Sequence, residues 1–196
     1  MMTHRLILAL ILTAAPALAE GTASPLQRAQ ISAQVFARGL AESDPLLMLT
    51  AARIRKTVGL DLAPRDPMSW QQMLGAASPL IEGDETLEQI AADLAAETAK
   101  GVAAGPVTRL AELAPGETAL PAMGFKGGVL AEVYVEAAPG VDVNLTVRDA
   151  EGNLVCRDSD ASYVAYCSWT PAGDGDFLLV VENRSQTPTD YALMTN

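Results

Sequence analysis

Acidic and amide side chains gather at the predicted turns of the second half of the chain. They form four pairs, Asp142 with Asn144, Asp149 with Glu151, Asp158 with Asp160 and Asp174 with Asp176, and five of these residues come first as metal ligands: Asp142, Asn144, Asp149, Asp158 and Asp160. Calcium takes about six to eight oxygen ligands, and loop carboxylates and amides are its usual source. These five residues are therefore the candidate calcium ligands. The alternative is that turns favour Asp and Asn for backbone reasons alone.

None of these clusters is an EF-hand. Counting from Asp158, the sixth position is Tyr163, where that loop requires glycine, and the twelfth is Trp169, where it requires glutamate. A calcium site here would have to be assembled from several loops.

The two cysteines, Cys156 and Cys167, are the other pair with chemical potential. They do not form the Cys-x-x-Cys spacing of a redox site. In an exported protein, two cysteines on neighbouring strands are expected to oxidise. We predict a structural disulfide between two adjacent strands of a hairpin over residues 154–169.

The chain contains one histidine, His4, and it lies in the predicted export signal. The mature protein then has no imidazole to act as a general base or metal ligand. This excludes Ser-His-Asp and Cys-His hydrolases and His-ligated zinc enzymes. A hydrolase that works with carboxylates alone remains open, and it would need two acids converging in a cleft.

Residues 1–19 have the pattern of a secretory signal peptide. Arg5 precedes an apolar run, and Ala17 and Ala19 flank a small-x-small cleavage site before Glu20. We expect a periplasmic or secreted protein without membrane insertion. The formal net charge of −11 becomes more negative when Arg5 is removed. Such a charge repels phosphate backbones and anionic lipid, so nucleic acid is excluded as a partner.

Residues 20–104 are predicted to form a helical region. Ala29, Ala33, Phe36 and Leu40 recur at helical spacing and fall on one face. A second helix should begin at a Ser43 or Asp44 cap, with Pro45 in its first position, and end at Gly59. The short connection predicts that the two helices pack antiparallel.

Two further helices are predicted in this region. Prolines confine one of them to about residues 69–74, where Trp70 either caps a small core or marks a pocket. The other begins at an Asp84 cap and buries a stripe of Leu87, Ile90 and Leu94.

Residues 105–196 have the alternation of β-strands. In the runs 129–136 and 141–148 apolar side chains alternate with polar ones, which predicts one buried and one solvated face. Short strands separated by turns predict an antiparallel sandwich of jelly-roll type. The fold class is therefore α+β in segregated regions. Tyr134 and Tyr166 fall on the polar faces of their strands, where they form either a contact surface or an ordinary cross-strand pair.

Several segments of this half resemble the bacterial pre-peptidase C-terminal domain. They are Phe125-Lys126-Gly127-Gly128, the run 141–153, Cys167-Ser168-Trp169-Thr170-Pro171 and Gly175-Asp176-Phe177. The resemblance covers residues 105–196 and implies a β-sandwich that secreted proteins carry as an accessory module. Related modules bind calcium or polymeric substrates. Many of them have Asp-x-Asp where this chain has Asp142-Val143-Asn144, so one acid is missing here.

The sequence thus favours a non-catalytic exported protein whose sandwich is an accessory or binding module for a protein or polymer partner. A calcium-dependent binding module is the first alternative, and a carboxylate-only hydrolase is the second.

Overall fold

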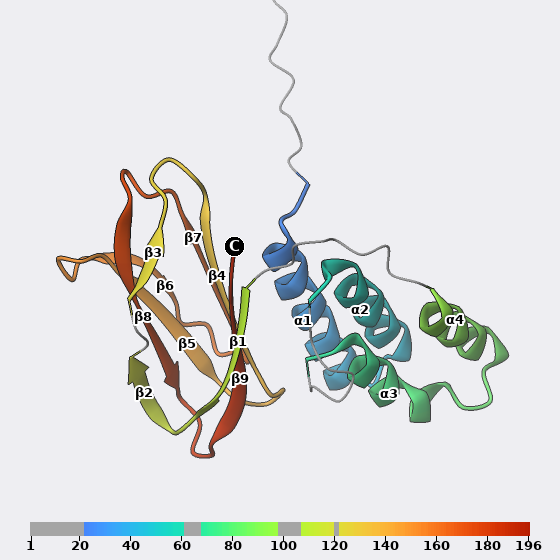
Figure 1. Ribbon diagram of the computed structural model, residues 1–196. Helices are drawn as coiled ribbons and strands as arrows, with labels where there is room; N and C mark the ends of the chain where they lie inside the picture. The colour runs from blue at the N-terminus through green and yellow to red at the C-terminus, as the bar shows by residue number, and fades with distance from the viewer. Residues whose placement is uncertain (1–21, 61–67, 98–106, 120–121) are drawn as a thin grey trace, which may run out of the picture.

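The helices and the strands form two separate parts of the molecule (Figure 1). A computed structural model describes residues 22–60, 68–97, 107–119 and 122–196. Its helices are α1 (Pro25–Glu42), α2 (Pro45–Val58), α3 (Trp70–Ile81) and α4 (Glu85–Ala96). Its strands are β1 (Val107–Leu113), β2 (Gly116–Ala119), β3 (Met123–Phe125), β4 (Ala131–Ala137), β5 (Val143–Arg148), β6 (Leu154–Asp158), β7 (Val164–Trp169), β8 (Gly175–Asn183) and β9 (Thr189–Thr195). The predicted α+β class is confirmed.

Capping residues set the helix ends as expected. Asp44 is the N-cap of α2 and accepts hydrogen bonds from two first-turn amides, with Pro45 in the first position. Ser43 instead ends α1, in a left-handed conformation with φ 53°. Gly59 ends α2 with φ 72°, a conformation that glycine adopts without strain. In the described ranges, no helix combines the length and the hydropathy needed to cross a membrane.

Helix α3 is longer than predicted. It runs from Trp70 to Ile81 and includes Pro79, which was expected to break it. Met73, Ala77 and Ile81 recur every four residues and are all buried, so packing continues the helix past the proline.

Two predicted core positions are also wrong. Leu40 and Ile90 are 40% and 39% exposed, because Gly39 takes the buried position on α1 and α4 buries only Leu94.

The strands form two antiparallel sheets, as predicted. One sheet has the order β1-β9-β4-β7, and the other has the order β2-β8-β5-β6, with β3 also paired to β8. Alternate side chains from both sheets fill the space between them, among them Phe177, Leu179 and Val181 of β8. Phe125, Trp169 and Phe177 close this core, with ring centroids 4.9 to 5.9 Å apart.

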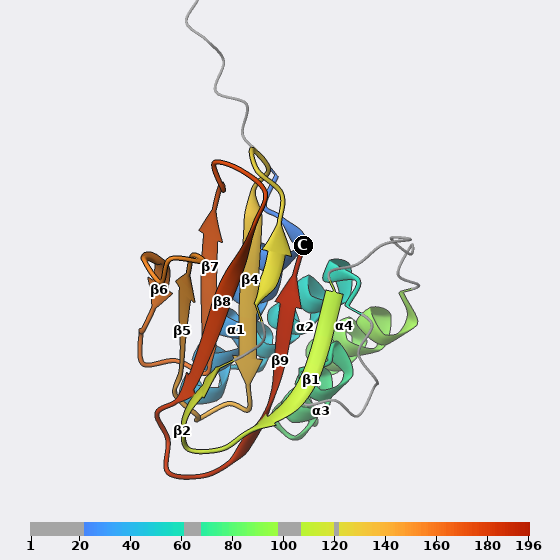
Figure 2. The ribbon, with the colours of Figure 1, turned by 60° about the vertical axis from the view of Figure 1, so that its left-hand side comes forward.

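Strand β4 has no solvated face. All seven of its residues are buried, including Glu132, Tyr134 and Glu136 on the face predicted to be wet. The reason is that the helices cover this side of the sheet. Leu26 and Ala33 of α1 pack with Tyr134 and neighbouring strand residues in one apolar cluster. Figure 1 shows the helices on one side of the sandwich, and Figure 2 shows them behind β4 and β9.

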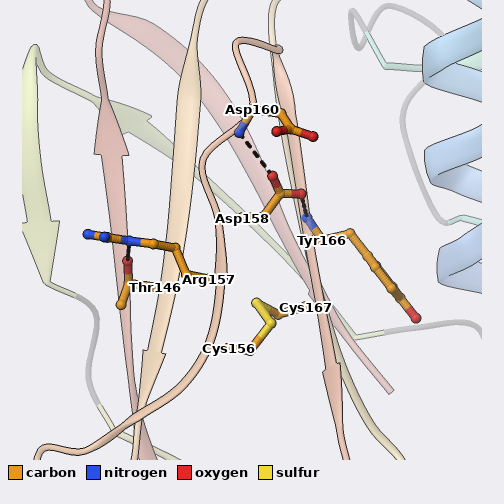
Figure 3. Close-up of a disulfide and its surroundings, with 7 residues drawn as sticks. All are labelled: Thr146, Cys156, Arg157, Asp158, Asp160, Tyr166 and Cys167. Atoms are coloured by element: carbon orange, nitrogen blue, oxygen red, sulfur yellow. Dashed lines mark hydrogen bonds between the residues drawn. A yellow bond between two sulfur atoms is a disulfide. The ribbon is translucent and has the colours of Figure 1, made fainter.

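The predicted hairpin over residues 154–169 is wrong in its pairing, although its strands and its disulfide are present. Strand β6 pairs with β5 in one sheet, and β7 pairs with β4 in the other. The chain therefore crosses from sheet to sheet between them. Cys156 and Cys167 form a disulfide with Cα atoms 5.9 Å apart (Figure 3). The bond fastens the edges of the two sheets together.

Candidate functional site

Two buried carboxylates lie between the helices and the sandwich. Glu132 and Glu136 are 3% and 1% exposed, and both project from the outer face of β4 toward the helices. They are the only buried acids among the described residues. Buried acids are rare and need partners, so their surroundings decide what this region does.

Arg55 of α2 binds Glu136 with both arms of its guanidinium group. Nη1 lies 2.6 Å from Oε2 and Nη2 lies 3.0 Å from Oε1, with both side chains 1–2% exposed. The remaining donors reach the Ser32 hydroxyl and the carbonyl oxygens of Ala29 and Met68. Burial opposes the charged guanidinium, but the charge and hydrogen bonds of Glu136, together with Tyr134 and Tyr163, outweigh it, so the pKa of Arg55 is raised.

Two tyrosines complete this polar network. The Tyr134 hydroxyl donates to Glu136 at 2.7 Å, and the Tyr163 hydroxyl donates to the carbonyl oxygen of Ala33 in α1 at 2.6 Å. Burial and then the Glu136 charge raise the pKa of both tyrosines. Both phenols are therefore neutral hydrogen-bond donors at ordinary pH.

Glu132 holds the first turn of α1. Its Oε1 accepts hydrogen bonds from Ser24, the N-cap residue, at 2.5 Å and from Tyr166 at 2.6 Å. The Ser24 hydroxyl also accepts from the amide of Gln27 within the capping box. Burial and the bond to Glu132 raise the pKa of Tyr166. Glu132 of the sandwich thus binds the N-cap residue of α1, the first helix of the chain.

The two carboxylates do not form a catalytic pair. They are four positions apart along one strand, which places their Cα atoms about 13 Å apart. Acid pairs that work on one glycosidic bond are about 5–9.5 Å apart. Each carboxylate is also bound to its own set of partners under α1 and α2. The arrangement positions the helices on the sheet.

The candidate calcium ligands lie at separate places. Asp149 accepts hydrogen bonds from the backbone and side chain of Asn153, and these bonds lower its pKa. Asp158 accepts from the amides of Asp160 and Tyr166 (Figure 3). Within the described ranges, no three or more His, Cys, Asp or Glu side chains are grouped so as to hold a metal ion.

Asp142 and Asn144 differ from the other candidates. The Oδ1 atom of each is buried and has no hydrogen-bond partner. They are two residues apart at the start of β5, so they lie on one side of the strand. The Asp142 carboxylate also lies near Arg184, whose pKa is raised by its bond to Glu182 and by the charges of both acids. Of the five candidates, these two have buried side-chain oxygen atoms without a hydrogen-bond partner.

Helix α4 lies at the end of the molecule away from the sandwich (Figure 1). A groove is lined by residues of α2 and α4. Its volume is about 310 Å³. Each helix lines it with residues spaced i, i+3, i+4 and i+7: Leu46, Leu49, Thr50 and Arg53 from α2, and Ile90, Asp93, Leu94 and Glu97 from the end of α4. An ion pair joins the last residue of each set, with 2.9 Å between Arg53 Nη2 and Glu97 Oε1.

The C-terminal end of helix α4 is held to α2 by polar contacts. The Lys56 ammonium group donates to the carbonyl oxygen of Leu94, and a cation is favourable at this end of a helix. The same nitrogen lies 4.1 Å from the ring centroid of Trp70. Trp70 is therefore covered by a cation and contributes to helix packing.

Sequence patterns missed the buried network. Glu132, Tyr134 and Glu136 follow strict alternation and were assigned to solvent. A usable signal was Arg55, a charged residue between Ala52 and Val58, which are both buried. Tyr134 and Tyr166 lie opposite each other in the register of β4 and β7, so they form the cross-strand pair, and helix α1 covers that face of the sheet.

No protein-family model matches the chain, and no curated protein sequence matches it. Among solved structures, it is similar to the pre-peptidase C-terminal domain of a collagenase from Bacillus anthracis, with 12% identity, a TM-score of 0.37, and coverage of 46% of this chain and 89% of that one. For the Yersinia pseudotuberculosis-derived mitogen the identity is 16%, the TM-score 0.33, and the coverage 47% and 85%. For a designed double-stranded β-helix the identity is 14%, the TM-score is 0.29, and the match covers 46% of this chain and 99% of that one. Similarities of this size establish no family, so membership in the pre-peptidase C-terminal family stays a prediction.

Proposed function

We propose that this chain is a non-catalytic exported binding protein, in which the sandwich carries a helical platform that contacts a partner protein. The observation that supports the proposal is that both buried carboxylates are hydrogen-bonded to residues of the helical region. Glu132 and Glu136 are the pair that a carboxylate-only hydrolase would use between helices and sandwich, and both are bound to structural partners. Exposed apolar side chains on the helices, such as Leu46 and Ile90, support a binding role.

Export is part of this proposal. The signal pattern lies in residues 1–19, outside the described residues, and the disulfide supports an oxidising compartment. A mature N-terminus at Glu20, found by mass spectrometry of the periplasmic or extracellular fraction, is the expected result. Retention of residues 1–19 in the cytosol would overturn it.

Photo-crosslinking in cells tests the binding role. A photoreactive amino acid replaces Thr50, in the α2/α4 groove, or Leu178, which is 36% exposed on β8 of the other sheet. A protein adduct of defined mass from either position supports a binding protein. The absence of adducts from both positions, together with hydrolytic turnover that Glu132→Gln abolishes, would overturn it.

Calcium-dependent binding is a second candidate, supported by the unpartnered oxygens of Asp142 and Asn144. These two residues supply few of the ligands that calcium needs, so solvent or a partner would complete the site. Calcium at millimolar concentration should raise the melting temperature of the wild-type protein and leave Asp142→Ala unchanged. An equal shift in both proteins would reject this site.

A further inference from the structure

The α2/α4 groove leaves apolar surface uncovered. Leu46 and Ile90, at its open end, are 53% and 39% exposed. Fully burying one such side chain is worth about 1.5–3 kcal/mol. A ligand that covers both therefore gains binding energy from the hydrophobic effect.

The shape of the groove matches a helix. Its two walls are helices, and each contributes residues at i, i+3, i+4 and i+7, a stretch of about 10 Å. An amphipathic helix that enters such a groove presents apolar residues at the same spacing. The Arg53–Glu97 ion pair bounds the groove at one end and fixes its length.

The charge around the groove is negative. Residues 82–97 include six acidic and no basic residues. Asp93 and Glu97 line the groove directly, and the one lining cation, Arg53, is paired with Glu97. A ligand with Lys or Arg beside its apolar stripe complements this field, whereas an acidic ligand is repelled.

We propose that the α2/α4 groove binds a basic amphipathic helix of a partner protein, with apolar side chains between Leu46 and Ile90 and basic ones toward Asp93. This inference rests on the proposed function and adds the site and the chemistry of the partner. A second copy of the chain is a poorer occupant, because the net charge of −11 repels it.

A designed peptide tests the proposal with the full mature protein. The probe is a fluorescent helix of about 14 residues, about 20 Å long, with leucines at i, i+4 and i+7 and lysines on the flanks. Its affinity is measured by fluorescence anisotropy. The expected results are saturable binding that weakens with salt, and no binding of the peptide in which glutamate replaces lysine.

Two variants of equal charge locate the site. Ile90→Lys places a cation in the groove and should weaken binding at least about tenfold. Leu80→Lys is the control, because Leu80 is 45% exposed on α3 and does not line the groove. Its affinity should stay within about twofold of wild type. Equal melting temperatures for the two variants would show that both are folded.

Four outcomes overturn the proposal. One is an equal loss of affinity in both variants, which indicates general charge attraction. The second is equal binding of the acidic peptide. The third is wild-type self-association that Ile90→Lys abolishes, which would assign the groove to a second copy. Adducts from Leu178 but not from Thr50 in cells would also reject the groove while leaving the proposed binding function intact.

Discussion

Arg55 joins the helices to the sandwich through one side chain. Its guanidinium group reaches α1 through Ala29 and Ser32, and it reaches β4 through Glu136. An ion pair as buried as this one contributes little net stability compared with apolar residues, but removing one partner leaves an uncompensated charge. The Arg55–Glu136 pair therefore acts mainly on how the helices are oriented on the sandwich.

Arg55→Met is expected to lower the free energy of unfolding by about 3–5 kcal/mol, because Glu136 is left buried and unpaired. Denaturant unfolding measures the loss. Arg53→Met is the matched control two residues away, since the Arg53–Glu97 pair is exposed and is worth about 0–1 kcal/mol. Combining Arg55→Met with Glu136→Leu should cost less than the two single changes together. Additive losses would contradict the pairing.

Among the helices, one glycine lies at a close approach and another does not. A Cβ atom on Gly39 of α1 would lie 2.7 Å from Cγ and 3.0 Å from the backbone nitrogen of Met48 in α2. A Cβ atom on Gly75 of α3 would have no neighbour within 4 Å. An alanine at Gly75 therefore changes only helix propensity, whereas an alanine at Gly39 changes both helix propensity and packing.

Gly39→Ala should destabilise the protein by about 1–3 kcal/mol, because the clash with Met48 outweighs the better helix propensity of alanine. Gly75→Ala should stabilise it by about 0.4–1 kcal/mol. Thermal or denaturant unfolding of the two variants gives the comparison. Changes of the same sign would show that the α1/α2 contact is looser than 2.7 Å suggests.

The disulfide acts between elements that do not pair with each other. Replacing Cys156 and Cys167 together by alanine should lower stability by about 3 kcal/mol, as loop-closure entropy predicts for a bond spanning 11 positions. Unfolding with and without a reductant measures this. The reductant should shift the wild-type midpoint and leave the double variant unmoved. An unmoved wild-type midpoint would contradict a stabilising role.

At the scale of the whole molecule, burial raises the pKa of all four tyrosines above the ordinary value of 10.0. Three of them, Tyr134, Tyr163 and Tyr166, hydrogen-bond at the helix–sandwich contact, and Tyr191 faces the sandwich core. The folded protein therefore holds these protons more tightly than the unfolded chain does.

This difference predicts alkaline instability. The stabilising contribution of the tyrosines is fully present below about pH 10 and is lost as pH rises through their raised pKa values. Tyrosinate absorbance should therefore appear together with the loss of circular dichroism. Titration of a tyrosine at its ordinary pKa in the folded protein would contradict this assignment.

Local patterns predicted the elements of this fold because their causes are local. The Asp44 cap with Pro45 and the Gly59 stop depend on neighbours a few residues away. The disulfide partners needed no choice, since the chain has two cysteines. The candidate calcium residues and the pre-peptidase C-terminal resemblance stay predictions.

Only the tertiary structure determined which faces of the strands are exposed to solvent. Alternation assigned Glu132, Tyr134 and Glu136 to solvent, but residues about 80 to 110 positions earlier cover them and supply Arg55 and Ser24 as partners. The same long-range packing put β6 and β7 in different sheets and left Ile90 exposed in the groove. The sequence by itself determined the types of the elements and the ends set by local caps, whereas contacts between distant segments determined which faces are buried and which stay exposed, because burial depends on what the rest of the chain places on each face.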